Sequence, residues 1–199
     1  MNTGENQKIG KENLGEILSL LGERLALAFP GKEWKLIVCG GAALAELDLV
    51  QRTTKDIDVI GSFSEAQVEY AGFDSKFKEQ VSIIAEIFNL PPDWINTGPE
   101  SFLQTGLPAG ILDRLTKKKY GENLTIGFIS RIDQVFLKLY ASVDRGGYHV
   151  DDLIKLAPSE KELLDACRWV CQQDTSETFA LLLKSMLEQI GYQDVARRL

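Results

Sequence analysis

The sequence predicts a mixed α/β fold of the α+β type, in which a small mixed β-sheet with helices is followed by a helical C-terminal part. Two observations support this prediction. Short apolar runs, typical of buried strands, alternate with segments of helical periodicity in the first part of the chain. After about residue 130, the helical periodicity alone continues. We therefore expect a core over residues 12–130 and a helical part over residues 131–199, packed on it as one compact unit.

Composition sets the broad class of the protein. The chain has 199 residues, of which 44% are hydrophobic and 26% are charged, as is ordinary for a folded globular protein. The formal net charge is -7 and the pI is about 4.9. An acidic chain is a poor general binder of nucleic acids and anionic membranes, unless a local basic patch overrides the average.

Cysteine spacing and hydropathy both indicate an intracellular protein. Cys39, Cys167 and Cys171 form an odd set without the spacing of a disulfide framework, so we expect three free thiols in a reducing compartment. The N-terminal segment is polar, and no apolar stretch reaches the length of roughly 18 residues that a membrane span needs. We therefore expect a cytoplasmic protein that has no membrane partner.

The part of the chain before residue 90 shows the patterns of helix, strand, helix, strand and helix in turn. A polar tail over residues 1–10, which we expect to be frayed, precedes the first helix. Gly40 and Gly41 separate the first strand from an alanine- and leucine-rich helix. Ser62 and Glu65 have the spacing of a helix capping box. The expected helices cover residues 12–29, 42–49 and 75–89, and the expected strands cover residues 35–39 and 56–60.

The rest of the chain holds one more predicted strand and then helices. Residues 93–123 show no clear period, so we expect irregular structure there, including the basic run 117–119. Residues 124–129 alternate as a strand does. Ser159 with Glu162 predicts a capping box at the start of a helix. The helices expected after the strand cover residues 131–144, 151–156, 159–173 and 176–189, with a short turn at the C-terminus.

Asp56 and Asp58 are the first candidates for a functional site. Side chains alternate along a strand, so both carboxylates project from one face, about 7 Å apart at the backbone, while Ile57 and Val59 point into the core. Two like charges beside a core are costly unless a partner compensates them, and a divalent cation is the natural partner. The alternative is that the two acids form an ordinary solvated face.

The Gly40 and Gly41 turn is the second candidate. Glycines let the backbone approach a ligand closely, and the N–H groups of the helix that follows can face a phosphate. Arg52 and Lys55 can pair with the acids or hold phosphate oxygens. The alternative is that glycine serves the geometry of a strand-to-helix turn.

Taken together, the order Gly-Gly, Ala-Leu, Arg-x-Thr and Asp-Ile-Asp-Val-Ile resembles the nucleotidyltransferase superfamily with the DNA polymerase beta type of fold. More narrowly, it resembles the small bacterial abortive-infection and toxin-type nucleotidyltransferases. The matching residues are Gly40, Gly41, Ala42, Leu44, Arg52, Thr54, Asp56, Ile57 and Asp58. The resemblance implies that Asp56 and Asp58 bind Mg²⁺ or Mn²⁺. It also implies that the two glycines, Arg52 and Thr54 hold the nucleoside triphosphate.

The resemblance extends to the segment FLKLYASVDRGGYHVDDLIKL. Lys138, Arg145 and Asp152 match the lysine, arginine and aspartate of the family's later motifs, and His149 stands in a loop where many members have an aspartate. Lys138 lies away from the apolar stripe of its helix, and Arg145 follows two turns later on the same face, so both cations can meet a triphosphate. Asp152 either orients Lys138 or binds the acceptor.

These observations favour metal-dependent transfer of a nucleoside monophosphate from a nucleoside triphosphate to an acceptor, which is RNA, a protein or a small molecule. The superfamily has a third carboxylate on a later strand, whereas residues 124–129 carry no acid. The alternative is therefore a catalytically degenerate nucleotide- or partner-binding module, as one half of a toxin–antitoxin pair with a small antitoxin. The basic run 117–119 is either an RNA-backbone contact or a solvated loop, and residues 93–96 either stack on a nucleotide or form a packing turn.

Overall fold

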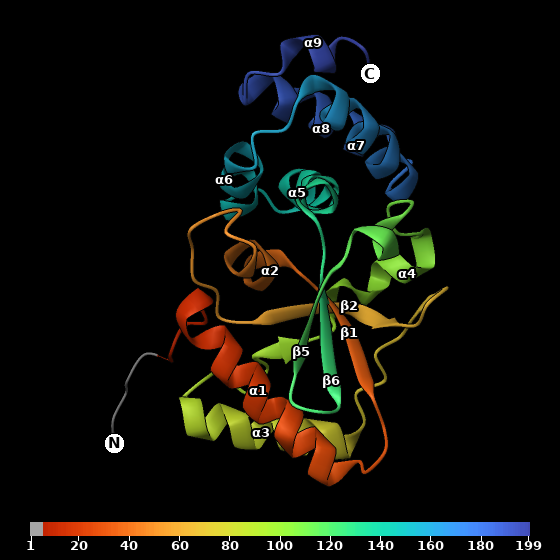
Figure 1. Ribbon diagram of the computed structural model, residues 1–199. Helices are drawn as coiled ribbons and strands as arrows, with labels where there is room; N and C mark the ends of the chain where they lie inside the picture. The colour runs from red at the N-terminus through yellow and green to blue at the C-terminus, as the bar shows by residue number, and fades with distance from the viewer. Residues whose placement is uncertain (1–5) are drawn as a thin grey trace. The chain divides into compact units, whose positions relative to one another are not determined.

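A computed structural model describes residues 6–199 of the chain, which form two compact units (Figure 1). Within the described residues, the first unit comprises residues 6–104 and Leu112–Ile129, and the second comprises Thr105–Ile111 and Ser130–Leu199. The mixed α/β class expected from the sequence is confirmed. The main boundary falls between Ile129 and Ser130, one residue before the start that we expected for the helical part.

The first unit contains the β-sheet and the helices that cover it. Its helices are α1 (Lys11–Ala28), α2 (Gly40–Glu46) and α3 (Ser75–Phe88). Its strands are β1 (Trp34–Cys39), β2 (Ile57–Phe63), β3 (Val68–Glu69), β4 (Ile95–Asn96), β5 (Thr116–Tyr120) and β6 (Leu124–Phe128). Three short helical turns lie between β4 and β5: η1 (Gly98–Ser101), α4 (Phe102–Thr105) and η2 (Ile111–Arg114). Thr105, the last residue of α4, and Ile111, the first residue of η2, belong to the second unit.

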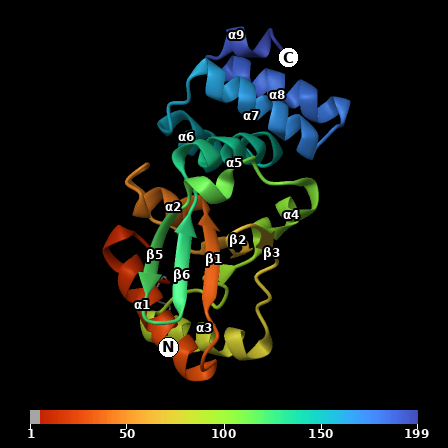
Figure 2. The same cartoon turned by 45° about the vertical axis from the view of Figure 1, so that its right-hand side comes forward.

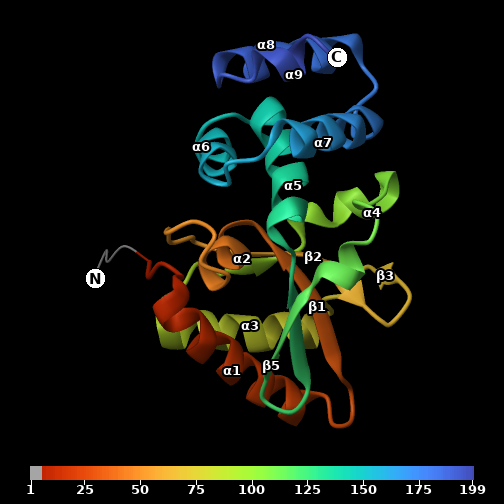
Figure 3. The same cartoon turned by 45° about the horizontal axis from the view of Figure 1, so that its top comes forward.

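Strand β1 is the centre of the sheet, because its apolar residues can be buried on both faces. The strand order is β3-β2-β1-β6-β5, and β4 pairs with β2 on a separate branch. Strand β1 runs antiparallel to β2 and parallel to β6 (Figure 2). Helices α1 and α3 lie side by side against one face of the sheet, as Figures 1 and 3 show. Their apolar stripes bury the core there, with Trp34, Phe73 and Phe77 as an aromatic cluster.

Three sequence-based expectations for this unit were wrong. The tail was expected to fray, but Ile9 is buried and pairs with Thr54, while residues 1–5 of that tail lie outside the described residues. Ser62 does not cap a helix, because β2 runs through it. The segment 93–123 is not irregular throughout, since it contains β4 and β5. The reason is that short strands without an apolar period of their own are stabilised by their neighbours: β4 pairs with the distant β2, and β5 forms a hairpin with β6 and packs against α1.

The second unit consists of helices arranged around α5. They are α5 (Arg131–Asp144), α6 (Tyr148–Lys155), α7 (Glu160–Gln173), α8 (Glu177–Gln189) and α9 (Gln193–Ala196). Helix α5 packs against α6, α7 and α8. The predicted capping box at the start of α7 is confirmed, since Ser159 Oγ and the Glu162 carboxylate each pair with the other residue's backbone. Helix α6 begins earlier than expected, so His149 lies in a helix and not in a loop.

An arginine joins the elements of the second unit. The Arg131 guanidinium donates to the carbonyl oxygens of Leu156 and Ala157 and to the Glu162 carboxylate, at 2.7 Å for the shortest contact with Glu162. This hydrogen bond is the main cause that lowers the pKa of Glu162 to about 2. The start of α5 is therefore tied to the α6–α7 connection and to the α7 cap. Among the helices of residues 6–199, none has the length and apolarity needed to cross a membrane.

Gly22 in α1 should resist substitution, whereas Gly15 in the same helix should not. A Cβ at Gly22 would collide with the backbone carbonyl of Tyr120 in β5, but a Cβ at Gly15 would meet nothing within 4 Å. We expect Gly22→Ala to lower the free energy of unfolding by about 1–3 kcal/mol. Gly15→Ala should raise it by up to about 1 kcal/mol, because alanine favours helix. Urea unfolding of both variants tests this, and equal effects would contradict the close packing of α1 on β5.

Candidate functional site

Two glycines and two aspartates come together where β1 ends and β2 begins. Cys39, the last residue of β1, pairs with Asp58 in β2, so the turn at Gly40 follows directly beside Asp58. Gly40 has φ of +66°, and a Cβ on it would lie 2.6 Å from Asp58 Oδ2. Because this is far closer than a side chain tolerates, glycine is required here both for backbone conformation and for the approach to the carboxylate.

Gly41 makes a second close approach, to the segment that precedes β2. A Cβ on Gly41 would lie 2.8 Å from Thr54 Cβ and 3.4 Å from Arg52 Nε. The start of α2 thus lies against Thr54, Arg52 and Asp58 at once. We call the six residues Gly40, Gly41, Arg52, Thr54, Asp56 and Asp58 the glycine–aspartate site. The structure brings together all six residues that the sequence pattern predicted for the first part of the chain.

The two carboxylates are partly exposed. The strand begins at Ile57 and not at Asp56, but the expected alternation holds, since Ile57 and Val59 are fully buried while both aspartates are half-buried. Thr54 Oγ1 donates a hydrogen bond of 2.9 Å to Asp56 Oδ1 and so orients this carboxylate. Because both carboxylates keep contact with solvent, their burial alone does not require a bound metal ion.

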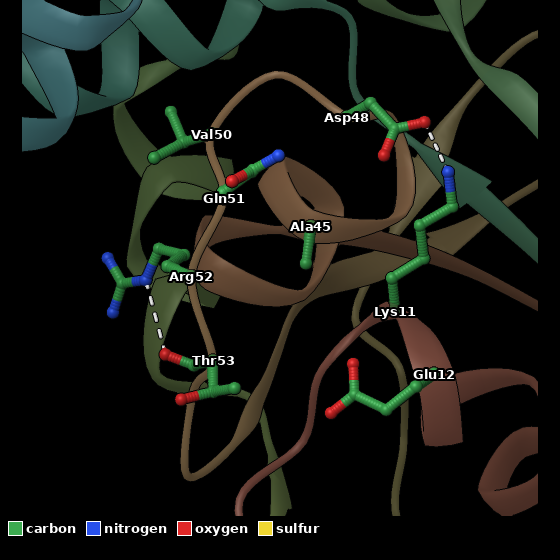
Figure 4. Close-up of a pocket in the computed structure, with 8 residues that line it drawn as sticks. All are labelled: Lys11, Glu12, Ala45, Asp48, Val50, Gln51, Arg52 and Thr53. Carbon is green, nitrogen blue, oxygen red and sulfur yellow. Dashed lines mark hydrogen bonds and ion pairs between the residues drawn. The ribbon is translucent and has the colours of Figure 1, made fainter.

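The N-terminal residues hold the segment that carries Thr54. The N–H of Ile9 donates to Thr54 O and the N–H of Thr54 donates to Ile9 O, each at 2.8 Å. Next to this bridge is a shallow pocket, in which Figure 4 shows Arg52 on one side and the Lys11–Asp48 ion pair on the other. Its lining residues are Lys11, Glu12, Ala45, Asp48, Val50, Gln51, Arg52 and Thr53.

Asn96 is a neighbour of Asp58 that sequence reasoning missed. In the parallel pairing of β2 with β4, Asp58 is opposite Asn96 and Ile57 is opposite Ile95, so Asp58 and Asn96 project from the same face. Asn96 Oδ1 accepts a hydrogen bond of 2.9 Å from the N–H of Gly98, which fixes the side chain. The later strand beside Asp58 is therefore β4, whereas the predicted strand at residues 124–129, which carries no acid, forms β6 and pairs with β1. The signal for this short strand in the sequence was Ile95, which stands between Trp94 and Asn96 shortly after Pro91 and Pro92.

The segment around β4 also settles the two interpretations of residues 93–96. Trp94 is fully buried, and its Nε1 donates a hydrogen bond of 2.9 Å to Val81 O. A side chain held in this way cannot stack on a nucleotide. The packing interpretation is correct for the tryptophan, and Asn96 is the residue of this segment that reaches the site face.

Lys138 and Asp152 form a buried ion pair within the second unit. Their charged atoms Nζ and Oδ2 are 2.8 Å apart, and the two residues are 4% and 3% exposed. The expectation that Lys138 faces outward from its helix was wrong, because α5 is the central helix of its unit and buries its polar side as well. Of the two roles left open for Asp152, the pairing favours orientation of Lys138.

Arg145 does not share a face with Lys138. It is the residue that follows the last turn of α5, its side chain is 64% exposed, and its Nε lies 3.1 Å from Asp144 Oδ2. Lys138, Arg145 and Asp152 belong to the second unit, and the glycine–aspartate site belongs to the first. The expectation that the two cations present together was wrong, since Lys138 is buried against Asp152 of α6 whereas Arg145 is exposed to solvent.

The remaining candidate ligands form no further site. Cys39, Cys167 and Cys171 are free thiols, as expected. Burial raises the pKa of the Cys167 thiol to about 12 and also raises that of Cys171, so neither is a ready nucleophile. Within residues 6–199, no group of three or more histidine, cysteine, aspartate or glutamate side chains is placed to hold a metal ion. The glycine–aspartate site thus has two carboxylates.

The Lys138–Asp152 pair should be strongly coupled in stability. Removing either charge leaves the other one buried, so we expect Lys138→Met and Asp152→Leu each to lower the free energy of unfolding by about 3–5 kcal/mol. The double variant should lose much less than the sum of the two, because no unpaired charge remains. Urea unfolding of the four proteins measures this coupling, and additive losses would show that the pair is not a buried interaction.

Comparison with known proteins gives no family for this chain. None of the protein-family models, curated proteins or solved structures compared with it is a match. The resemblance to nucleotidyltransferases therefore stays a prediction, and its support lies in the residues and geometry of the chain itself.

Proposed function

We propose that the protein is a metal-dependent nucleotidyltransferase, which transfers a nucleoside monophosphate from a nucleoside triphosphate to RNA, a protein or a small molecule. One observation carries the proposal. Two separate segments, 40–41 and 52–58, meet so that two partly exposed carboxylates lie against a turn without side chains. A side chain at position 40 would crowd Asp58 Oδ2, so glycine keeps the space beside this carboxylate open.

The carboxylates are assigned to the metal. Carboxylate oxygens are the ligands that Mg²⁺ and Mn²⁺ prefer, and the hydrogen bond from Thr54 holds Asp56 ready to bind. When bound, the metal supplies charge neutralisation for the phosphates that react. Asp56 and Asp58 hold it, and Asn96 adds a neutral carboxamide oxygen on the same face as Asp58.

The glycines and Arg52 are assigned to the triphosphate. Since Gly40 and Gly41 carry no side chain, a phosphate can approach the backbone beside the carboxylates closely. The Arg52 guanidinium, which lies next to Gly41, is suited to phosphate oxygens because it offers several donors in one plane. The triphosphate contacts predicted from the sequence for Lys138 and Arg145 stay predictions, since the charge of Lys138 is already offset by Asp152 and both residues belong to the second unit.

The second candidate is a catalytically degenerate nucleotide- or partner-binding module, such as one half of a toxin–antitoxin pair. The observation that favours it is the identity of residue 96. The side chain beside Asp58 is an amide, which binds a cation more weakly than a carboxylate and does not act as a base. Metal and nucleotide binding can persist at such a site while transfer is lost.

Nucleotide binding with and without Mg²⁺ is the first test of the proposal. We expect the protein to bind nucleoside triphosphates in a Mg²⁺-dependent way and to release pyrophosphate when a suitable acceptor is present. Asp56→Asn and Asp58→Asn should each weaken binding at least about tenfold, because each removes a charged ligand of the cation. Asp93→Asn, which changes an exposed aspartate of the same unit, should leave binding unchanged.

Calorimetric titration and a coupled pyrophosphate assay measure the two quantities. Absence of metal-dependent nucleotide binding by the parent protein would contradict both the transferase and the nucleotide-binding form of the module. Binding without pyrophosphate release, across RNA, protein and small-molecule acceptors, would favour the binding module over the transferase.

Asn96→Asp should strengthen metal binding. A third carboxylate on the face of Asp58 adds a charged ligand, so we expect the affinity for Mn²⁺ to rise about tenfold or more. An aspartate oxygen can still accept the hydrogen bond from Gly98, so the turn after β4 should be preserved. Asn123→Asp, in the β5–β6 turn, is the control for added charge. Manganese titration followed by electron paramagnetic resonance tests this, and unchanged affinity would show that Asp58 and Asn96 do not share a ligand site.

A further inference from the structure

Three lysines gather on one face of the sheet, although they come from two different strands. Lys35 in β1 and Lys119 in β5 are both opposite Thr125 of β6, one on each side. Lys117 is two residues from Lys119 and therefore projects from the same face. We call Lys35, Lys117 and Lys119 the lysine face. Figure 2 shows β5, β6 and β1 as neighbouring strands.

Lys118 belongs to the opposite face, so the basic run is not one uniform patch. It is opposite Ile126, which is part of the core covered by α1 and α3. Its Nζ forms an ion pair with the nearly buried carboxylate of Glu46, at the end of α2. Alternation along β5 therefore directs Lys118 toward Glu46 on one face of the sheet and Lys117 and Lys119 to the other face.

The lysine face keeps a positive surplus in an acidic protein. Lys35 Nζ is 3.0 Å from Glu33 Oε2, and the pKa of Glu33 is lowered mainly by Lys35 and also by Lys119. Lys117 Nζ lies 5.4 Å from the centre of the Phe63 ring. The Glu33 carboxylate therefore interacts with two of the three lysines, Lys35 and Lys119. The whole chain, by contrast, has a formal net charge of -7. A local potential opposite in sign to the average attracts polyanions to this face.

We propose that the lysine face binds the phosphodiester backbone of a single-stranded nucleic acid. The backbones of Lys35 and Lys119 lie about 10 Å apart across β6, and those of Lys117 and Lys119 about 7 Å apart along β5. These separations suit successive phosphates and exceed the reach of one phosphate group. The Thr125 hydroxyl lies between the two rows as a further donor. Binding of this kind is independent of base sequence and does not rest on nucleotidyl transfer.

Fluorescence anisotropy of the full chain with a labelled oligonucleotide of about 20 mixed-sequence bases, as RNA and as DNA, tests the proposal. Affinity should fall with salt, with a logarithmic slope near -2 for three contacted phosphates. Lys117→Gln combined with Lys119→Gln should weaken binding about tenfold and flatten that slope. Lys35→Gln should have a smaller effect in the same direction.

Lys118→Gln is the matched control, because it removes the same charge from the same strand on the opposite face. It should change affinity less than twofold, and thermal unfolding of every variant checks that the fold is kept. Equal binding of RNA and DNA supports recognition of phosphate alone, whereas tighter RNA binding adds a 2′-hydroxyl contact to it. Absence of binding at low salt, an equal loss in Lys118→Gln, or binding to anionic vesicles and not to oligonucleotides would overturn the proposal.

Discussion

The contact between the Gly40 turn and Asp58 is the constraint on which the candidate site depends. Antiparallel pairing of β1 with β2 brings Cys39 opposite Asp58, and the chain then turns into α2 directly against that carboxylate. A side chain at position 40 would displace the Asp58 carboxylate, and the positive φ at the start of α2 also favours glycine. Gly41 repeats the arrangement against Thr54, which Ile9 holds from the other side. The site is thus fixed by backbone pairing on three segments.

The charged residues predicted for the site differ in their environment: one pair is buried, and the two aspartates of β2 and its approach are partly exposed. Lys138 and Asp152 neutralise each other inside the second unit, where an unpaired charge would be strongly destabilising. Asp56 and Asp58 keep partial contact with solvent. This contrast matters for function, because a residue type that matches a catalytic motif is useful to a ligand only if its partner leaves it accessible. Lys138 matches such a motif by position, yet its pairing with Asp152 gives it the character of a structural residue.

The residue beside Asp58 bears differently on the proposed metal binding and on the proposed catalysis. Asn96 occupies the adjacent strand position with a neutral amide, held by the N–H of Gly98. Hard divalent cations prefer carboxylate and amide oxygens, whereas an amide does not act as a base, so metal binding and proton removal place different demands on residue 96. The sheet adds a second polar region at β5 and β6, where alternation assigns neighbouring lysines to opposite faces.

The sequence by itself determined the features that depend on local chain geometry. The alternation of buried Ile57 and Val59 with the two aspartates, the Ser159 capping box and the bounds of α5 follow from periodicities of two or from contacts within one turn. Only the tertiary structure decided which segments meet. Asn96 beside Asp58, Ile9 on Thr54 and the burial of Lys138 all depend on pairing or packing with residues distant in the chain. These contacts produce no periodic pattern in the sequence. A strand of two residues, or the polar side of a central helix, is stabilised by the elements that pack against it and not by its own residue pattern.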